Sequence, residues 1–66
     1  MPFTLQLIPE AGEKLTIRVN NTDKLHISGN TMMITNKDTL PITIARFNNE
    51  DNMWHGYNNK YKEILF

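Results

Sequence analysis

The chain has no cysteine among its 66 residues. A disulfide framework, a thiolate metal site and a cysteine nucleophile are therefore excluded. The two histidines, His26 and His55, are the remaining soft metal ligands, and neither has a second histidine at a helical or strand spacing. We therefore expect no metal and no cofactor, and at this length one domain covering residues 1–66.

Long apolar runs and a one-sided charge balance are also lacking. The N-terminus has no basic region before an apolar stretch, and no later segment approaches the length of a membrane span. Seven basic residues balance seven acidic ones, and the balance holds in both halves of the chain. Proteins that bind duplex DNA usually carry a basic face, and the charge balance predicts none here. The lack of apolar segments predicts a soluble, cytoplasmic protein with no membrane partner.

Asparagine is the residue that the chain has in excess. The nine asparagines occupy positions 20, 21, 30, 36, 48, 49, 52, 58 and 59. All fall between apolar periodic runs, where a side chain that bonds its own backbone and tolerates positive φ is favoured. We interpret them as turn residues. Such a composition is also associated with AT-rich coding sources such as phages and mobile elements.

A hairpin is indicated at residues 24–35, KLHISGNTMMIT, because Gly29-Asn30 is a favoured two-residue turn between alternating segments. The turn predicts the pairs Ser28–Thr31, Ile27–Met32, His26–Met33 and Leu25–Ile34. One face of this hairpin is then apolar and the other polar, with Met33 on the polar face beside His26. A slip of one residue would reverse both faces.

The same alternation extends to both sides of this hairpin. Upstream, the predicted pairs are Leu5–Ile17, Leu7–Leu15, Ile17–Ile27 and Val19–Leu25. Downstream, they are Met32–Ile42, Ile34–Leu40 and Thr35–Thr39. Pro41 lies inside this fifth strand, so we expect its position to be an edge or a bulge. Residues 53–57 predict a sixth strand, and residues 61–66 either a closing strand or a helical turn.

These patterns predict an all-β fold, a small antiparallel meander of five to six strands with one short C-terminal helical turn as an option. Its single apolar face must be covered. The ways to cover it are curling into a small barrel of OB- or SH3-like size, packing of the C-terminal segment over the face, and pairing with a second copy. We favour the curled sheet or barrel, with a homodimer as the alternative.

The best candidate for a site is the segment MWHGYNNKYK at 53–62, which holds the only tryptophan and both tyrosines. Aromatic rings and cations are what single-stranded nucleic acids contact. The candidate partner-binding residues are Arg46, Trp54, Tyr57, Lys60, Tyr61 and Lys62. Burial of one tryptophan contributes about 5 kcal/mol, as much as the whole net stability of so small a domain. Trp54 is therefore interpreted mainly as core, and Gly56 as a bulge or tight bend rather than a contact with a ligand backbone.

No catalytic residue is expected. The carboxylates fall at solvated loop and turn positions, and nothing in the sequence forces two of them into one apolar pocket. His26 lies two residues from Ser28 on the same strand face, which is ordinary sheet patterning. A glycine-rich phosphate loop and a calcium-binding loop are both missing.

The function predicted from the sequence is therefore a small non-enzymatic module that binds another protein, as an accessory or inhibitory protein of a phage or mobile element. The free edges of a small sheet can accept a partner strand through main-chain hydrogen bonds. The alternative is single-stranded nucleic-acid binding by residues 54–62.

Overall fold

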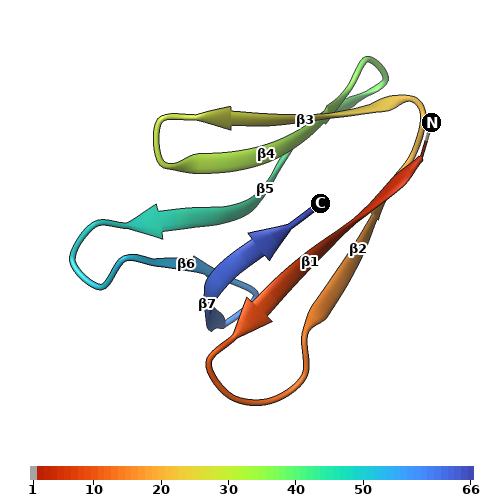
Figure 1. Cartoon of the computed structure of the whole chain (residues 1–66). Coiled ribbons are helices and arrows are strands. Elements are labelled where there is room, and N and C mark those ends of the chain that lie inside the picture. The colour runs from red at the N-terminus through yellow and green to blue at the C-terminus, as the bar shows by residue number, and fades with distance from the viewer. Residues whose placement is uncertain (1) are drawn as a thin grey trace.

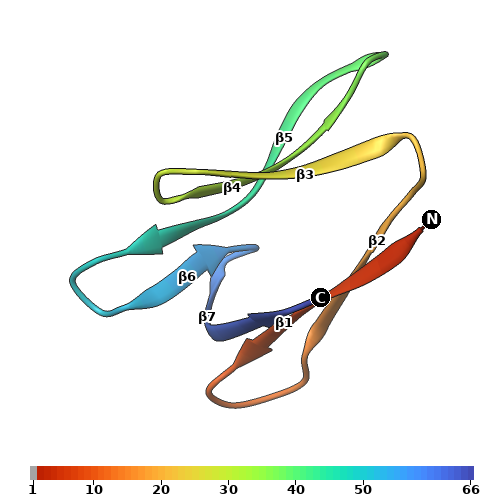
Figure 2. The ribbon, with the colours of Figure 1, turned by 45° about the horizontal axis from the view of Figure 1, so that its top comes forward.

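A computed structural model describes residues 2–66, which form strands and turns without a helix. The seven strands are β1 (Phe3–Pro9), β2 (Leu15–Val19), β3 (Asp23–Ser28), β4 (Thr31–Asn36), β5 (Thr39–Asn48), β6 (Met53–Gly56) and β7 (Asn59–Leu65). They make one antiparallel sheet in the order β2-β1-β7-β6-β5-β4-β3, curled into a half-barrel (Figures 1 and 2). Within residues 2–66 no helix could cross a membrane.

The predicted all-β meander is confirmed, and its strand count is corrected. The strand count is seven rather than five or six, because residues 53–65 supply two further strands. Of the two alternatives predicted for residues 61–66, the closing strand is confirmed, as part of β7 (Asn59–Leu65), and the helical turn does not form. This segment does not lie over the apolar face either. It joins the sheet between β1 and β6.

The β3–β4 hairpin has the register that its sequence predicts, with Ser28 opposite Thr31, His26 opposite Met33 and the intervening pairs in step. Gly29 adopts φ 59°, a conformation that suits glycine at the first central position of a two-residue hairpin turn. The carbonyl of the other turn residue, Asn30, accepts a hydrogen bond of 2.7 Å from the Phe47 amide. The turn is therefore also tied to β5.

The register predicted between β4 and β5 is wrong. Asn36 faces Thr39, Ile34 faces Ile42, and Met32 faces Ala45. The Asn36 side chain accepts the Asp38 amide at 2.9 Å, which shortens the turn by one residue relative to the prediction. Two register shifts then add residues on β5.

The first of these shifts places Leu40 and Pro41 opposite Thr35 alone. Proline lacks the N–H that a regular ladder uses, so a bulge accommodates it. The expectation that Pro41 lies at a bulge or an edge is confirmed. The second shift leaves Ile44 as the extra residue between the pairs of Thr43 and Ala45.

The predicted β1–β2 pairs are confirmed, but the predicted pairing of β2 with β3 is wrong. Leu5 faces Ile17 and Leu7 faces Leu15, as expected. β2 and β3 are instead the two ends of the sheet. The other side of β1 is taken by β7, where Leu7 faces Ile64. β2 and β3 consequently meet only at the turn that joins them and diverge from it (Figures 1 and 2).

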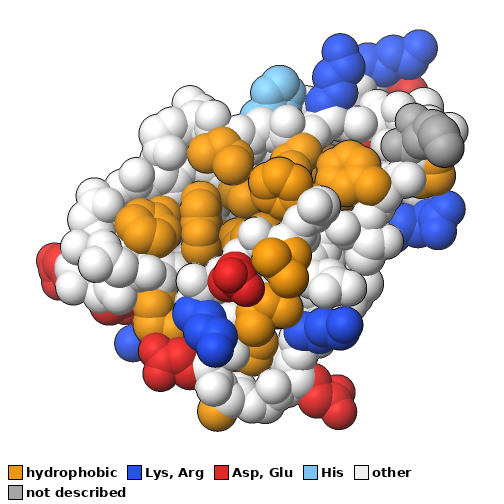
Figure 3. Space-filling view, in the orientation of Figure 1, with side chains coloured by type: hydrophobic (Ala, Val, Ile, Leu, Met, Phe, Trp, Pro, Cys, Tyr) orange, Lys and Arg blue, Asp and Glu red, His pale blue; other side chains and the backbone are white. Residues whose placement is uncertain are grey.

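One face of the sheet carries the core, because directly paired residues of an antiparallel ladder point to the same side. We call this the inner face, and the opposite one the outer face. The core residues are Leu5, Leu7, Val19, Met32, Ile44, Ala45 and Tyr61, each at most 4% exposed. Figure 3 shows apolar side chains as a continuous band between β3–β5 and β7–β1. Ile27 and Ile42 lie on this face as predicted but are exposed. Leu40 was predicted to face Ile34, but it stands opposite Thr35 of the outer face and is exposed.

Candidate functional site

The candidate residues of β6 and β7 separate onto the two faces of the sheet. Trp54 pairs with Phe47 on one side and Tyr61 on the other, so these three rings point to the inner face. Tyr61 is buried, and Trp54 is half-buried with its ring edge-to-face on Phe47, at a centroid distance of 5.3 Å. Trp54 and Tyr61 therefore belong to the packing of the half-barrel.

The outer face of the same strands carries a row of basic side chains. His55 pairs with Arg46 of β5 and with Lys60 of β7, which sets the three side chains side by side across the sheet. These residues and Tyr57 line an open hollow of about 710 Å³, which also includes Gly56 and the Asn58–Asn59 segment. We call Arg46, His55, Tyr57 and Lys60 the outer-face site. Lys62 is exposed but lies outside this hollow.

Tyr57 is placed at the rim of the hollow by an unusual turn. Gly56 pairs with Asn59, so the β6–β7 loop consists of Tyr57 and Asn58 alone. Both have positive φ, 52° and 57°, as the right-handed twist of a two-residue hairpin demands. Asparagine tolerates this conformation, but a bulky residue such as tyrosine is strained in it. Strained residues concentrate at functional positions, and the Tyr57 side chain is 53% exposed.

Gly56 fits between two strands where no other residue fits. A Cβ atom at this position would lie 2.5 Å from the carbonyl oxygen of Ile44 and 3.4 Å from Cα of Ala45. Of the two predicted alternatives, a bulge is not present, because the pairing of β6 with β7 shows no register shift here. Gly56 instead directly precedes the tight two-residue turn. The close approach is by the backbone of β5, at the point where Ile44 is the extra residue.

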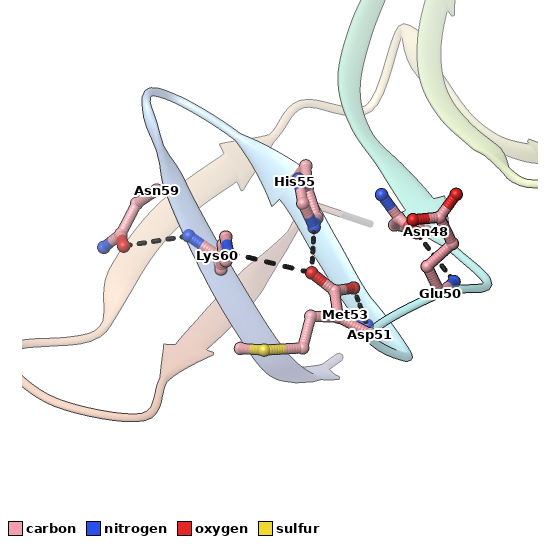
Figure 4. A network of polar contacts seen from close by, with 7 residues as sticks. All are labelled: Asn48, Glu50, Asp51, Met53, His55, Asn59 and Lys60. Atoms are coloured by element: carbon pink, nitrogen blue, oxygen red, sulfur yellow. Dashed lines mark hydrogen bonds and ion pairs between the residues drawn. The ribbon is translucent and has the colours of Figure 1, made fainter.

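Asp51 organises one end of the outer-face site, as Figure 4 shows. Its Oδ1 accepts the Met53 amide at 3.0 Å, and its Oδ2 lies 2.7 Å from Nε2 of His55 and 3.9 Å from Nζ of Lys60. Partial desolvation acts to raise the pKa of Asp51. The hydrogen bonds from His55 and Met53, with the charges of His55 and Lys60, outweigh it and lower this pKa. Asp51 is thus held as a carboxylate.

Arg46 is the basic residue of the site that Asp51 does not neutralise. It forms no ion pair with any residue in the range 2–66. It lines the main hollow and also a second one of about 480 Å³, formed with Phe47, the loop that follows β5 and His55. The guanidinium therefore stands between two concave surfaces, where it is available to an anionic group.

A metal-binding site was also sought among the residues that the structure describes. Across residues 2–66 there is no group of three or more histidine, aspartate or glutamate side chains arranged to hold a metal ion. Comparisons with models of protein families, with curated proteins and with solved structures found no match for this chain.

Sequence reasoning brought together Arg46, Tyr57 and Lys60 but missed His55 and Asp51. The missing signal was the register of the β5–β6 hairpin. Asn48 faces Met53 across a four-residue loop in which the Asn48 side chain accepts the Glu50 amide and Asn52 has positive φ. This pattern in NNEDN would have predicted Arg46 opposite His55.

Proposed function

We propose that this protein is a small, non-enzymatic module that binds another protein through the outer-face site. The observation that carries the proposal is the position of Arg46, which has no ion pair in residues 2–66 and lies in the same hollow as the exposed ring of Tyr57. Arginine and tyrosine are the side chains that most often dominate the energy of protein interfaces. A strained turn that presents Tyr57 adds to the argument.

The partner that fits this site is a protein segment with a carboxylate side chain. A guanidinium binds a carboxylate through two parallel hydrogen bonds, which gives both energy and orientation. Lys60 adds a second positive charge on the same face, although Asp51 lies 3.9 Å from its ammonium group. The ring of Tyr57 offers apolar area with a polar tip beside them.

A non-enzymatic role agrees with the state of Asp51, the acid that contacts His55 and Lys60. A general acid or base working near neutral pH needs a pKa near the working pH. The pKa of Asp51 is shifted in the other direction, and the carboxylate is already engaged with Met53 and His55. We infer that Asp51 fixes the hairpin and His55 rather than acting on a substrate.

Single-stranded nucleic-acid binding is the second candidate. It is less favoured, because most of the aromatic rings lie on the face of the sheet opposite the basic side chains. The segment 54–62 supplies three aromatic rings, but Trp54 and Tyr61 pair with each other on the face opposite Lys60. Only Tyr57 remains beside the basic row for base stacking. Stacking contributes about 1–3 kcal/mol per base, so a single ring gives weak affinity.

A pull-down from the native host tests the proposal. The bait is the wild-type protein or the variant Arg46→Ala/Tyr57→Asn, and the matched control is Arg18→Ala, which removes an exposed arginine of β2. Asparagine at position 57 suits the positive φ, so the variant should keep its fold. We expect one stoichiometric protein with wild type and control, and at least about tenfold weaker binding by the variant.

Two results would contradict this proposal. One is repeated failure to recover a partner, and the other is a partner that binds the variant as tightly as the wild type. A titration of labelled single-stranded DNA and RNA at low salt, run in parallel, tests the second candidate. Tight binding there that is lost in the variant would replace the protein partner by a nucleic acid.

A further inference from the structure

The inner face of the half-barrel is only partly covered by the chain itself. Phe3 faces the buried Val19, Ile27 faces the buried Met32, and Ile42 faces the half-buried Ile34, yet these three side chains are 40%, 54% and 56% exposed. Phe66, two residues after the inner-facing Ile64 of β7, is 74% exposed. Their pairing with core residues places Phe3, Ile27 and Ile42 on the face that carries the core cluster. Figure 3 shows apolar side chains exposed as a band on this face.

We propose that a second copy of this chain covers the inner face, so that the protein is a two-fold symmetric dimer. The four side chains expose on the order of 400 Å² of apolar surface, at roughly 150–200 Å² for a fully exposed large side chain. One side of a standard interface covers about 800 Å², of which a little more than half is apolar. The exposed surface therefore matches what one subunit of a stable dimer contributes.

A second copy fits this surface for two further reasons. The chain has no cysteine, and the core within residues 2–66 is small, with seven nearly inaccessible hydrophobic side chains. Domains of this size without disulfides commonly gain stability by oligomerisation. The formal net charge is zero, so long-range repulsion does not oppose association of identical copies. A two-fold axis brings the same patch of each copy together, apolar against apolar.

The dimer surface is separate from the outer-face site. Trp54 and Tyr61 point to the inner face, whereas His55 and Lys60 point to the outer one. A dimer therefore leaves Arg46 and Tyr57 accessible and presents two copies of the outer-face site. Failure of the dimer would leave the proposal for the outer-face site standing, and failure of that site would leave the dimer standing.

Sedimentation equilibrium tests the dimer with the wild type, with Ile42→Lys/Phe66→Lys, and with Tyr57→Asn as control. Tyr57 is also exposed, but it lies outside the proposed interface. We expect a dimer for wild type and control in a series from about 1 μM to about 1 mM, and a dissociation constant raised at least about tenfold in the lysine variant. A wild type that stays monomeric, or a lysine variant that dimerises equally well, overturns the proposal.

A second measurement covers the case in which the lysine variant fails to fold. Nuclear magnetic resonance of wild-type protein mixed from labelled and unlabelled copies reports contacts between subunits. We expect intermolecular contacts from the methyl groups of Ile27 and Ile42. Their absence, or contacts only from outer-face residues such as Tyr57, overturns the assignment of the interface.

Discussion

The conformation of Gly56 does not require glycine, since its φ is not among the positive values that other residues avoid. Glycine is required instead because a Cβ atom at this position would lie 2.5 Å from the carbonyl oxygen of Ile44 and clash with it. A methyl group there must displace backbone rather than a movable side chain. This close approach lies next to the outer-face site, because Gly56 stands between His55 and Tyr57 in the chain. The residue thus belongs to packing and to the site at once.

We expect Gly56→Ala to lower the free energy of unfolding by about 3 kcal/mol, the upper range for an extra methyl group in a packed region. The control is Gly29→Ala, where a Cβ would meet nothing within 4 Å and only the positive φ is strained. That strain costs about 1 kcal/mol. Urea denaturation followed by the emission of Trp54 measures both. Equal losses in the two variants would show that β5 can move away from Gly56.

Among the elements, the hairpins were predictable where turn chemistry and alternation agree. The Gly29–Asn30 turn and the β1–β2 pairs follow from the sequence because each depends on neighbouring residues only. The β5 register does not follow, because two residues are added at bulges and alternation alone carries no signal for them. The candidate site was predicted only in part, because residues close in sequence need not share a face of the sheet. Lys60 and Tyr61 are adjacent in β7 and so face opposite ways, which separates residues that were grouped by their proximity in the sequence.

The β5–β6 hairpin should depend on pH through Asp51. Its pKa is lowered in the folded protein, so its charged form adds stability above the pKa of the unfolded chain and loses it as pH falls through the folded pKa. We expect wild type to have a higher melting temperature than Asp51→Asn near pH 7. The difference should decrease below about pH 4 and disappear near pH 2. Thermal unfolding followed by circular dichroism measures it.

The partner of Asp51 in this effect is checked by the same comparison in a His55→Ala background. The pH-dependent difference should be smaller there, because the 2.7 Å contact with Nε2 is removed. Added salt should also reduce the difference, since both side chains are partly exposed and their attraction is screened. A difference that grows on acidification would contradict the assignment.

Across the whole molecule, the order of strands is the feature that the sequence did not reveal. Pairing of β1 with β7 joins the first and last strands, and no turn between them fixes the register. Hairpin reasoning instead extended the sheet from β2 directly to β3, whose apolar alternation fits equally well. The insertion of β7 beside β1 changes the shape of the protein. It makes β2 and β3 the free edges and lets the sheet curl into a half-barrel.

Two engineered cysteine pairs distinguish the observed sheet order from the one that alternation suggested. Gln6 and Leu65 face each other across β1 and β7, and Cα atoms of directly paired antiparallel residues lie within disulfide reach. Arg18 and His26 would face each other only if β2 paired with β3. We expect Gln6→Cys/Leu65→Cys to form an intramolecular disulfide on mild oxidation, and to raise the free energy of unfolding by up to roughly 4 kcal/mol.

The control pair Arg18→Cys/His26→Cys replaces exposed side chains, so it should fold equally well but remain reduced within each chain. Mass spectrometry after thiol alkylation separates intramolecular disulfides, intermolecular disulfides and free thiols. The stability gain has a physical cause in the long loop that the β1–β7 disulfide closes, since a cross-link restricts the unfolded chain more as the loop grows. The observed strand order would be contradicted if Arg18→Cys/His26→Cys formed an intramolecular disulfide efficiently while Gln6→Cys/Leu65→Cys kept free thiols. That result would show that β2 and β3 are neighbours.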